Sequence, residues 1–356
     1  MKEQLILQVN NLQTVFNTDK GKIRAVDGVS FAVPKGKTMG IVGESGSGKS
    51  ITALSILQLL ATNGHVKRGE VLFKGKDLVK LTDKQMRHIR GNQISMIFQE
   101  PMTSLNPVFT VGQQISETLR IHKNLSKKEA MVQAVDMLKL VGIPSPDKRV
   151  KQYPYELSGG MRQRVMIAMA LACNPEILIA DEPTTALDVT IQAQILELIK
   201  DLQNRLGMSV IMITHDLGVV AETCDYVAVM YAGQVVEYAD VRTLFKNPKH
   251  PYTLGLLNSL PRHDIDQDKL IPIKGVVPSP YEMPKGCRFA PRCPTATAHC
   301  NEKSPELLET NDNGQIRCWM YTDEWDGESE VTLYGETRVV MHFHPALAPV
   351  KAAVLP

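Results

Sequence analysis

The sequence has no long apolar run and no marked excess of charge of either sign. Its longest apolar stretches fall far short of the roughly 18–20 residues that a membrane-spanning helix needs. It has 40 Lys and Arg against 38 Asp and Glu, a formal net charge of +2, so charge alone gives no reason to expect nucleic-acid binding. The opening MKEQLILQVN lacks the basic and then apolar regions of a secretory signal. We therefore expect a cytoplasmic chain that works at a membrane only through partner proteins.

Internal repeats are also lacking, and the composition is ordinary. Hydrophobic residues make up 43% and charged residues 22%, which is typical of a globular protein and not of a disordered or fibrous chain. With 356 residues the chain is long for one domain and suits two. Beyond residue 250 proline becomes frequent and the periodic patterns fade. We predict a first domain over 1–250, an irregular module over 251–325, and a tail over 326–356 about which the sequence says little.

The first domain alternates strand-like and helix-like patterns. Apolar and polar residues alternate over 4–15, 24–33 and 69–78, which predicts an antiparallel layer of strands. Short apolar runs typical of buried parallel strands lie at 38–43, 176–183 and 209–216. Helical spacing of apolar residues marks 50–60, 101–152 and 191–207. Strands that alternate with helices predict an α/β fold with a mainly parallel sheet.

A glycine-rich segment joins a predicted strand to a predicted helix. It reads Gly43-Glu-Ser-Gly-Ser-Gly-Lys49-Ser50, and this context is the one that the phosphate-binding motif G-x-x-x-x-G-K-[ST] needs. Glycines let backbone N–H groups wrap a phosphate, and the helix N-terminus favours an anion. Lys49 is expected to reach the β- and γ-phosphates of ATP, and Ser50 to bind Mg²⁺. The predicted phosphate-binding residues are Gly43, Ser45, Gly46, Ser47, Gly48, Lys49, Ser50 and Ile51.

An acidic pair follows the apolar run at 177–180. Asp181 and Glu182 end this predicted strand, and open α/β sheets bind ligands at the carboxyl ends of their strands. Asp181 is expected to hold Mg²⁺ with Ser50, and Glu182 to act as the catalytic base that polarises the attacking water. A solvated acid pair at a strand end is the alternative, which the phosphate loop upstream disfavours.

A third motif, LSGGMRQR at 157–164, resembles the LSGGQ signature of the ATP-binding cassette (ABC) family, with Met161 in place of the usual Gln. Further marks of this family follow in the expected order over residues 1 to about 250. Gln99 resembles the catalytic-site glutamine that senses Mg²⁺ or water, and His215 resembles the catalytic switch histidine near the γ-phosphate. Ala186-Leu187-Asp188 resembles the D-loop, which crosses the dimer interface.

The adenine-stacking aromatic residue of this family is not at its usual position in this sequence. The aromatic residue that stacks on adenine normally lies a short way before the phosphate loop. Here the sole aromatic candidate is Phe16, which sits slightly early. Phe16 is therefore either the adenine-stacking residue or part of the core.

The resemblance implies an ABC-type nucleotide-binding domain, with a parallel sheet around the phosphate loop, an antiparallel β layer and a helical subdomain at about 101–157. In this family two cassettes face each other head to tail, and ATP lies between the phosphate loop of one and the signature of the other. The partner's ATP would then be contacted by Ser158, Gly159, Gly160 and Met161, and the helical subdomain would contact membrane subunits. The expected cofactors of the cassette are ATP and Mg²⁺.

Four of the six cysteines, Cys287, Cys293, Cys300 and Cys318, cluster late in the chain with the spacing C-x5-C-x6-C-x17-C. Together with QEPMTSLNP after Gln99, they resemble the C-terminal extension of bacterial dipeptide and oligopeptide importer ATPases, some of which hold a [4Fe–4S] cluster. Four thiolates suit such a cluster, and Arg288, Arg292 and Arg317 are available to offset its charge. Zinc is the second interpretation because four sulfurs also form a tetrahedral site, and unmetallated thiols are the third.

This branch of the family implies an importer ATPase bound peripherally to the cytoplasmic face of the inner membrane. Its expected partners are a second ATPase subunit (a homologous but different chain), two integral membrane permease subunits and, through them, an extracytoplasmic peptide-binding protein. The sequence leaves open a homodimer, and it leaves open nickel or glutathione as the cargo of an importer of the same branch. A soluble ABC ATPase of ribosomes or DNA is disfavoured, since the chain has one phosphate loop and no sustained heptads.

Overall fold

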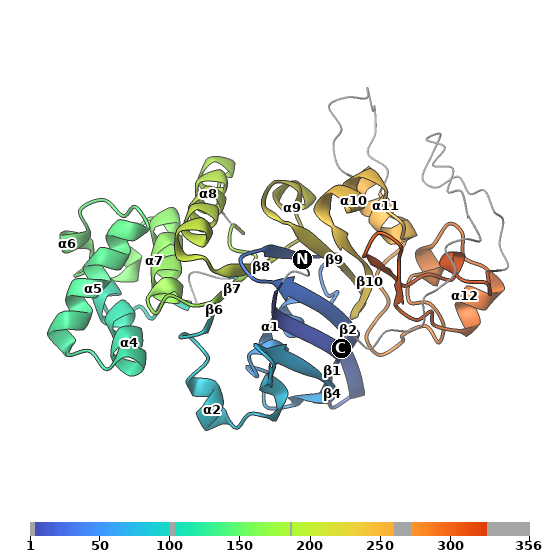
Figure 1. Ribbon diagram of the computed structural model, residues 1–356, viewed down its shortest axis with the longest axis horizontal. Coiled ribbons are helices and arrows are strands. Elements are labelled where there is room, and N and C mark those ends of the chain that lie inside the picture. The colour runs from blue at the N-terminus through green and yellow to red at the C-terminus, as the bar shows by residue number, and fades with distance from the viewer. Residues whose placement is uncertain (1–3, 100–103, 186, 260–271, 326–356) are drawn as a thin grey trace.

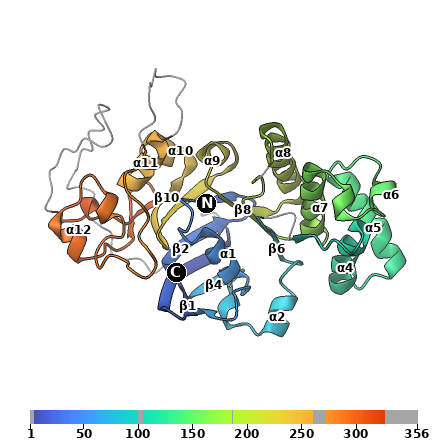
Figure 2. The same ribbon diagram turned by 180° about the vertical axis from the view of Figure 1, so that it is seen from behind.

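The computed structural model describes residues 4–99, 104–185, 187–259 and 272–325. Its helices are α1 (Lys49–Ile56), α2 (Asp83–Arg87), α4 (Val111–Lys123), α5 (Lys127–Leu140), α6 (Pro146–Arg149), α7 (Gly159–Leu171), α8 (Val189–Leu206), α9 (Leu217–Thr223), α10 (Val241–Lys246), α11 (Pro251–Asn258) and α12 (Ala298–Glu302). Figure 1 shows α4 to α7 at one end of the molecule, α12 at the other, and the strands between them. Figure 2 shows the same order from behind.

An eight-stranded sheet forms the centre of the molecule. Its order is β11-β12-β10-β9-β3-β8-β7-β6. The bounds are β3 (Thr38–Val42), β6 (Ile94–Ile97), β7 (Ile177–Asp181), β8 (Ser209–Thr214), β9 (Tyr226–Tyr231), β10 (Gln234–Asp240), β11 (Leu308–Glu309) and β12 (Gln315–Ile316). The strands from β9 to β6 pair in parallel, and β3, β7 and β8 are buried at every residue. Helices cover both faces of such strands, which is why their sequences are continuous apolar runs.

A second, antiparallel sheet packs beside the first. Its order is β2-β1-β4-β5, with bounds β1 (Leu5–Thr18), β2 (Gly21–Pro34), β4 (Gly64–Phe73) and β5 (Lys76–Asp77). Buried residues alternate with less buried ones in the second half of β2 and at the end of β4, as the sequence predicts, whereas β1 has four buried residues in a row from Leu12 to Val15. The apolar residues of this layer share one cluster with Met39 and Ile41 of β3. The α/β cassette fold with its antiparallel layer is therefore confirmed.

Local capping divides the helical segment that was predicted over 101–152. Thr110 begins α4 and Ser126 begins α5, each through a capping box with a Gln or Glu three residues later. Asn124 ends α4 in the left-handed conformation, with φ of 52°. The prediction of one helix over 50–60 was also too long, because α1 ends at Ile56 and Gln58 has a φ of 50°.

The C-terminal segment (272–325) is mostly irregular chain, but two of its short strands extend the main sheet. β12 pairs antiparallel with β10, and β11 pairs with β12. The ring of Phe289 lies 5.2 Å from that of Tyr231 and 5.4 Å from that of Tyr252, so the segment docks by an aromatic contact onto β9 and α11. Phe289 belongs to the largest apolar cluster of the molecule. The predicted tail at 326–356, including its possible strand SEVTLY, lies outside the described residues.

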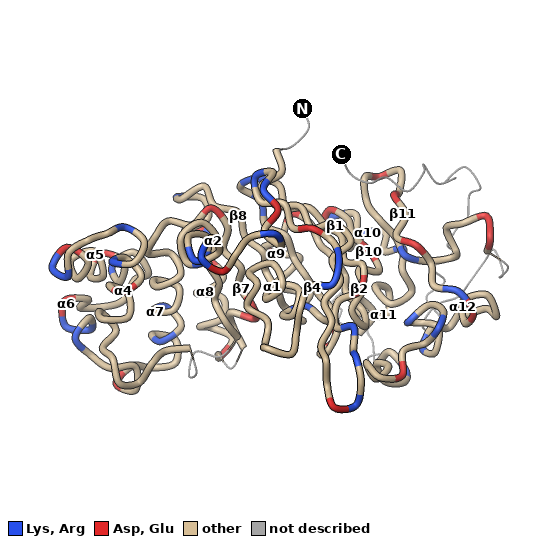
Figure 3. Tube along the Cα trace, turned by 90° about the horizontal axis from the view of Figure 1, so that it is seen from below, with Lys and Arg blue, Asp and Glu red and all other residues tan. Residues whose placement is uncertain are grey.

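Charged residues of both signs are scattered along the whole trace (Figure 3). Within the described ranges, we find no helix with the length and apolar character that a membrane crossing requires.

The boundary near residue 250 contains a fully buried histidine whose protonation should affect folding. His250 accepts a hydrogen bond at Nδ1 from the backbone N–H of Tyr252 (3.0 Å). Burial lowers the pKa of His250 to about 3, and Arg317 also lies within electrostatic range. In the unfolded chain this pKa returns to about 6.5. Between these values only the unfolded chain takes up the proton, so stability must fall as the pH drops below about 6.5.

We expect acidification to reduce the free energy of unfolding by up to about 1.4 kcal/mol per pH unit below 6.5 through this residue. Asn in its place keeps an acceptor for the helix N-terminus but cannot titrate. The urea midpoints of wild type and His250→Asn should therefore diverge between pH 7.5 and 5.5, with the variant less sensitive to acid. Identical pH slopes in the two proteins would rule out His250 as the source.

Candidate functional site

The glycine-rich loop lies between β3 and α1, at the carboxyl end of the main sheet. Gly43 has a φ of 148°, and a Cβ there would lie 2.1 Å from the carbonyl oxygen of Met230. Gly48 has a φ of 97°, and a Cβ there would lie 2.6 Å from the carbonyl oxygen of Ala25. These two positions admit only glycine, because any side chain would clash with backbone that cannot move aside.

Lys49 lies inside this loop. Its side chain is buried, and Nζ donates to the carbonyl oxygens of Gly43 (2.7 Å) and Glu44 (3.1 Å). Burial lowers the pKa of Lys49, while Glu182, Asp181 and Glu44 act in the opposite direction. A cation held by backbone carbonyl oxygens of a glycine-rich loop suits a polyphosphate.

Ser50 and Asp181 are in direct contact. Ser50 Oγ donates to Asp181 Oδ1 at 3.0 Å, which joins the start of α1 to the end of β7. Burial raises the pKa of Asp181, and the hydrogen bond from Ser50 opposes that rise. A hydroxyl and a carboxylate at this separation form the pair of oxygen ligands that Mg²⁺ binds in phosphate-loop proteins.

Glu182 is the centre of a hydrogen-bonded network. Its carboxylate accepts from Gln99 Nε2 (2.9 Å) and Thr185 Oγ1 (2.8 Å) and lies 3.2 Å from His215 Nδ1. Burial alone would raise the pKa of Glu182, but the hydrogen bonds from Thr185 and His215 lower it overall. The side chain is thus held as a carboxylate at neutral pH, which is the form that a general base requires. Thr185 was not predicted, because a threonine within TTAL carries no distinctive signal.

Part of this group lines a cavity of about 220 Å³, here called the phosphate-loop cavity, whereas Gly43, Asp181 and His215 are not among its lining residues. Its lining includes Ser45 to Ile51, Gln99 and Glu182. Six further lining residues were not predicted: Arg24, Ala25, Ala232, Gly233, Pro280 and Met283, of which the last two come from the C-terminal segment.

Phe16 is not among the residues that line the phosphate-loop cavity. It pairs with Gly64 across β1 and β4, and a Cβ at Gly64 would lie 2.4 Å from its ring. The structure therefore places Phe16 against the β-layer backbone, and its contact with adenine stays a prediction.

The signature residues lie away from this cavity. Ser158 caps α7, where its Oγ accepts from the backbone N–H of Met161 (3.3 Å), and Ser158 and Gly159 are exposed. Asp188 caps α8 in the same way and is also exposed. A buried hydrogen bond from Gln163 Nε2 to the carbonyl oxygen of Pro183 (2.6 Å) links α7 to the segment after Glu182. The exposed N-termini of α7 and α8 are thus separate from the phosphate-loop cavity.

The four late cysteines surround one small cavity of about 10 Å³, together with Trp319 and Met320. No disulfide joins any of the four. Burial raises the pKa of Cys287 to about 11 and raises those of Cys293 and Cys318 as well. In the described parts of the chain, no three His, Cys, Asp or Glu side chains are grouped in a way that could hold a metal ion.

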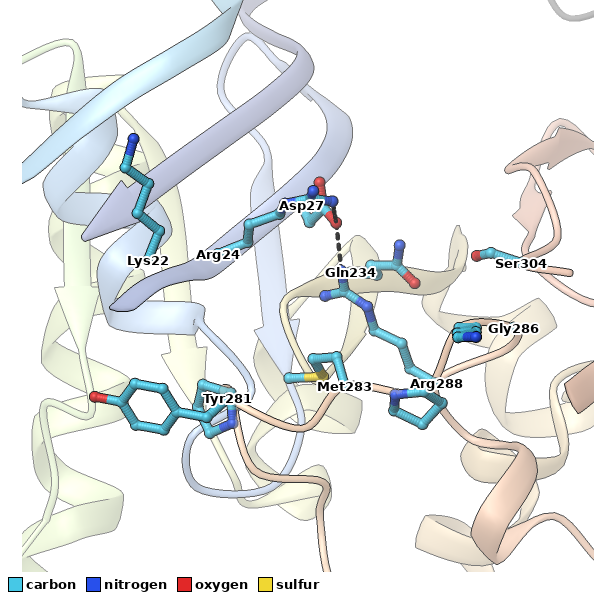
Figure 4. A pocket seen from close by; sticks show the side chains of 12 residues that line it. Lys22, Arg24, Asp27, Gln234, Tyr281, Met283, Gly286, Arg288 and Ser304 are labelled. Carbon is cyan, nitrogen blue, oxygen red and sulfur yellow. Dashed lines mark hydrogen bonds and ion pairs between the residues drawn. The ribbon is translucent and has the colours of Figure 1, made fainter. Parts of the chain in front are cut away.

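A larger cavity of about 400 Å³ adjoins the phosphate-loop cavity. Figure 4 shows its walls, with Lys22 and Arg24 from β2 on one side and Tyr281, Met283 and Arg288 from the C-terminal segment on the other. The dashed line in Figure 4 marks the buried ion pair between Arg288 and Asp27. The C-terminal segment therefore forms part of the wall of this cavity and of the phosphate-loop cavity.

Comparison with known proteins assigns this arrangement to a family. Residues 26–185 match the sequence model described as "ABC transporter", and residues 236–300 match "Oligopeptide/dipeptide transporter, C-terminal region". The chain is 57% identical over 320 residues to the oligopeptide transport ATP-binding protein AppD of Bacillus subtilis (strain 168), covering 90% of this chain and 98% of that protein. The chain belongs to the ABC transporter ATPases of the oligopeptide and dipeptide importer family.

Two further similarities support this ABC ATPase assignment. The dipeptide transport ATP-binding protein DppD of Bacillus subtilis (strain 168) is 55% identical over 316 residues, or 88% of this chain and 94% of DppD. The solved dimer of the ATP-binding cassette MJ0796 bound to ADP and Pi has a TM-score of 0.60 and 29% identity, and the match covers 66% of this chain and 99% of that cassette.

The network at Glu182 gives a direct test of this ABC ATPase. We expect Glu182→Gln to lower kcat for ATP hydrolysis at least about a hundredfold, because an amide cannot accept the proton of water. ATP binding should persist, since Lys49, Ser50 and the loop backbone are unchanged. Turnover and the Kd for ATP, measured separately, check both statements. The exposed Glu197→Gln on α8 is the matched control, and normal hydrolysis by Glu182→Gln would show that another group is the base.

Proposed function

We propose that this ABC ATPase binds Mg²⁺–ATP at the phosphate-loop cavity and hydrolyses it with Glu182 as base. The convergence of four elements carries the proposal: the loop after β3 with Lys49, the Ser50–Asp181 pair, the Glu182 carboxylate, and Gln99 with His215 beside it. Lys49 binds the β- and γ-phosphates, Ser50 and Asp181 hold Mg²⁺, and Glu182 takes a proton from the attacking water. Gln99 and His215 orient Glu182 and sense the γ-phosphate.

We propose further that the active unit is a head-to-tail pair of cassettes. Ser158, Gly159 and Gly160 cannot serve the phosphate-loop cavity of their own chain, since they are not part of its lining. Exposed at the start of α7, their N–H groups suit a phosphate bound by a partner. The known MJ0796 cassette with ADP and Pi is dimeric. The second cassette here is a homologous but different chain, and Asp188 lies at the contact between them.

The transport function follows from the relatives, which are named for oligopeptide and dipeptide transport. We propose that the chain energises import of peptides through two membrane permease subunits, which it joins at the cytoplasmic face with the helices α4 to α7. An extracytoplasmic peptide-binding protein delivers the cargo to the permease. Nickel and glutathione are the alternative cargoes, because an ATPase subunit does not itself contact the cargo.

Reconstitution tests the transport proposal. In liposomes with both permease subunits and the second cassette, a peptide-loaded binding protein should raise ATP hydrolysis and drive peptide into the lumen. Glu182→Gln should abolish uptake without preventing assembly. Binding proteins loaded with nickel or glutathione serve as competing cargoes. A chain that hydrolyses ATP at full rate but never joins the permease would contradict the importer function.

We also propose that the four-cysteine cavity holds a [4Fe–4S] cluster. Four thiols without a disulfide around one cavity are the donor set that such a cluster takes. Zinc is the alternative occupant, because four sulfurs also form a tetrahedral site. Thiolates bound to the cluster would cross-link the C-terminal segment, whose own apolar clusters are small.

Anaerobic purification tests the cluster. We expect broad visible absorption and about four irons per chain in the wild type. Cys300→Ser should lose both, whereas Cys224→Ser, a buried cysteine outside the cavity, should keep them. Zinc at about one atom per chain would support the second interpretation. A protein prepared in this way with neither metal would leave free thiols.

A further inference from the structure

Glu44, the residue that follows Gly43 in the phosphate loop, makes hydrogen bonds through its carboxylate, its backbone N–H and its carbonyl oxygen. Its carboxylate accepts two hydrogen bonds from the guanidinium of Arg292, at 2.6 and 3.0 Å. Its backbone N–H donates to Tyr252 Oη at 2.9 Å. Its carbonyl oxygen accepts from Lys49 Nζ at 3.1 Å. Arg292 and Tyr252 both lie beyond residue 250, so the part of the chain after the predicted first domain holds the phosphate loop in place.

Arg292 is itself firmly placed. Its side chain is 4% exposed, against 30% for Glu44. Nε donates to the carbonyl oxygen of Lys274 (3.0 Å), Nη1 lies 3.4 Å from Tyr231 Oη, and the guanidinium carbon is 5.7 Å from the centre of the Tyr231 ring. A paired guanidinium–carboxylate contact fixes orientation as well as distance, which a single lysine contact cannot do.

Arg292 contacts the phosphate loop and is also a sequence neighbour of the four-cysteine cavity. It directly precedes Cys293, one of the four cysteines around the small cavity. The sequence leaves these arginines available to offset the charge of a cluster, and several of their hydrogen bonds run to the cassette. Arg288 pairs with Asp27 and donates to the carbonyl oxygen of Ala232, and Arg317 donates to the carbonyl oxygen of Val235 at 2.9 Å.

We propose that Arg292 is a positioning residue of the ATP site, which holds the phosphate loop through Glu44 and makes ATP affinity depend on the C-terminal segment. Lys49 shares the carbonyl of Glu44, so a shift of Glu44 reaches the lysine that binds the phosphates. Loss of the pair leaves the loop free to sample conformations that do not bind ATP, and the apparent affinity falls by the fraction of competent molecules. The inference rests on the proposed ATP site.

A double-mutant cycle in the full-length chain tests this inference. Arg292→Met keeps the apolar stem without the charge, and Glu44→Gln removes the charge of its partner. We expect each change to raise the Kd for ATP by roughly tenfold, and the double variant to be no weaker than the worse single variant, since the two residues act through one contact. Arg292→Lys should lie between wild type and Arg292→Met. In the assembled importer, KM should rise in parallel while kcat changes by less than about twofold.

Arg317→Met is the matched control. Arg317 also lies beside a cysteine and also anchors the segment to the cassette, but its hydrogen bonds within the described part of the chain go to Val235, Pro305 and Gly28 and not to the phosphate loop. We expect it to lower the thermal midpoint while leaving the Kd for ATP within about twofold of wild type.

Two outcomes would overturn the inference. One is a folded Arg292→Met protein, checked by near-UV circular dichroism, that binds ATP like wild type. The other is an equal loss of affinity in Arg317→Met, which would mean that docking of the segment alone matters. The Kd is measured without turnover, so a chain that binds ATP but does not hydrolyse it would contradict the proposed function and leave this test intact.

Discussion

The parallel register of three buried strands determines where the chemistry takes place. Val42 of β3 lies opposite Thr214 of β8, and Ile213 of β8 lies opposite Asp181 of β7. The three strands therefore end at the same edge of the sheet, and the residues that follow them are brought together. The phosphate loop directly follows β3, Asp181 ends β7 with Glu182 next to it, and His215 directly follows β8. A slip of one residue in this register would turn every buried side chain to the wrong face.

The sequence was informative wherever chemistry depends on local order. The phosphate loop needs glycine at positions with positive φ, and a run of buried apolar residues before it, so its spacing alone predicts both strand and site. The same holds for Asp181 and Glu182 at a strand end. The helix N-terminus expected at the LSGGM motif is also present, where Ser158 caps α7, because a helix N-cap is a local feature. Direct contacts between Ser50 and Asp181 and between Gln99 and Glu182 then follow from the fold that these segments build.

Contacts between distant segments could not be predicted in this way. Arg292 reaches Glu44 across 248 positions, and nothing near either residue signals the other. Phe16 has the right residue type for adenine stacking, yet it packs on Gly64 because a glycine there leaves room for the ring. The C-terminal segment was predicted to be irregular, since two-residue strands such as β11 and β12 show no periodicity. Its order comes from docking, through Phe289 and the three arginines, and not from its own pattern.

The short strand β12 also has a consequence for the solution behaviour of the chain. It pairs with Glu237 and Tyr238 of β10, and the backbone N–H of Arg317 continues the ladder to Val236. Without this cover, β10 would be the outer strand of a large apolar sheet, with unpaired N–H and C=O groups open to another molecule. A chain truncated near residue 250 would thus expose the unpaired backbone groups of β10 to pairing with another molecule. The C-terminal segment protects the ATPase from self-association as well as bracing its nucleotide loop.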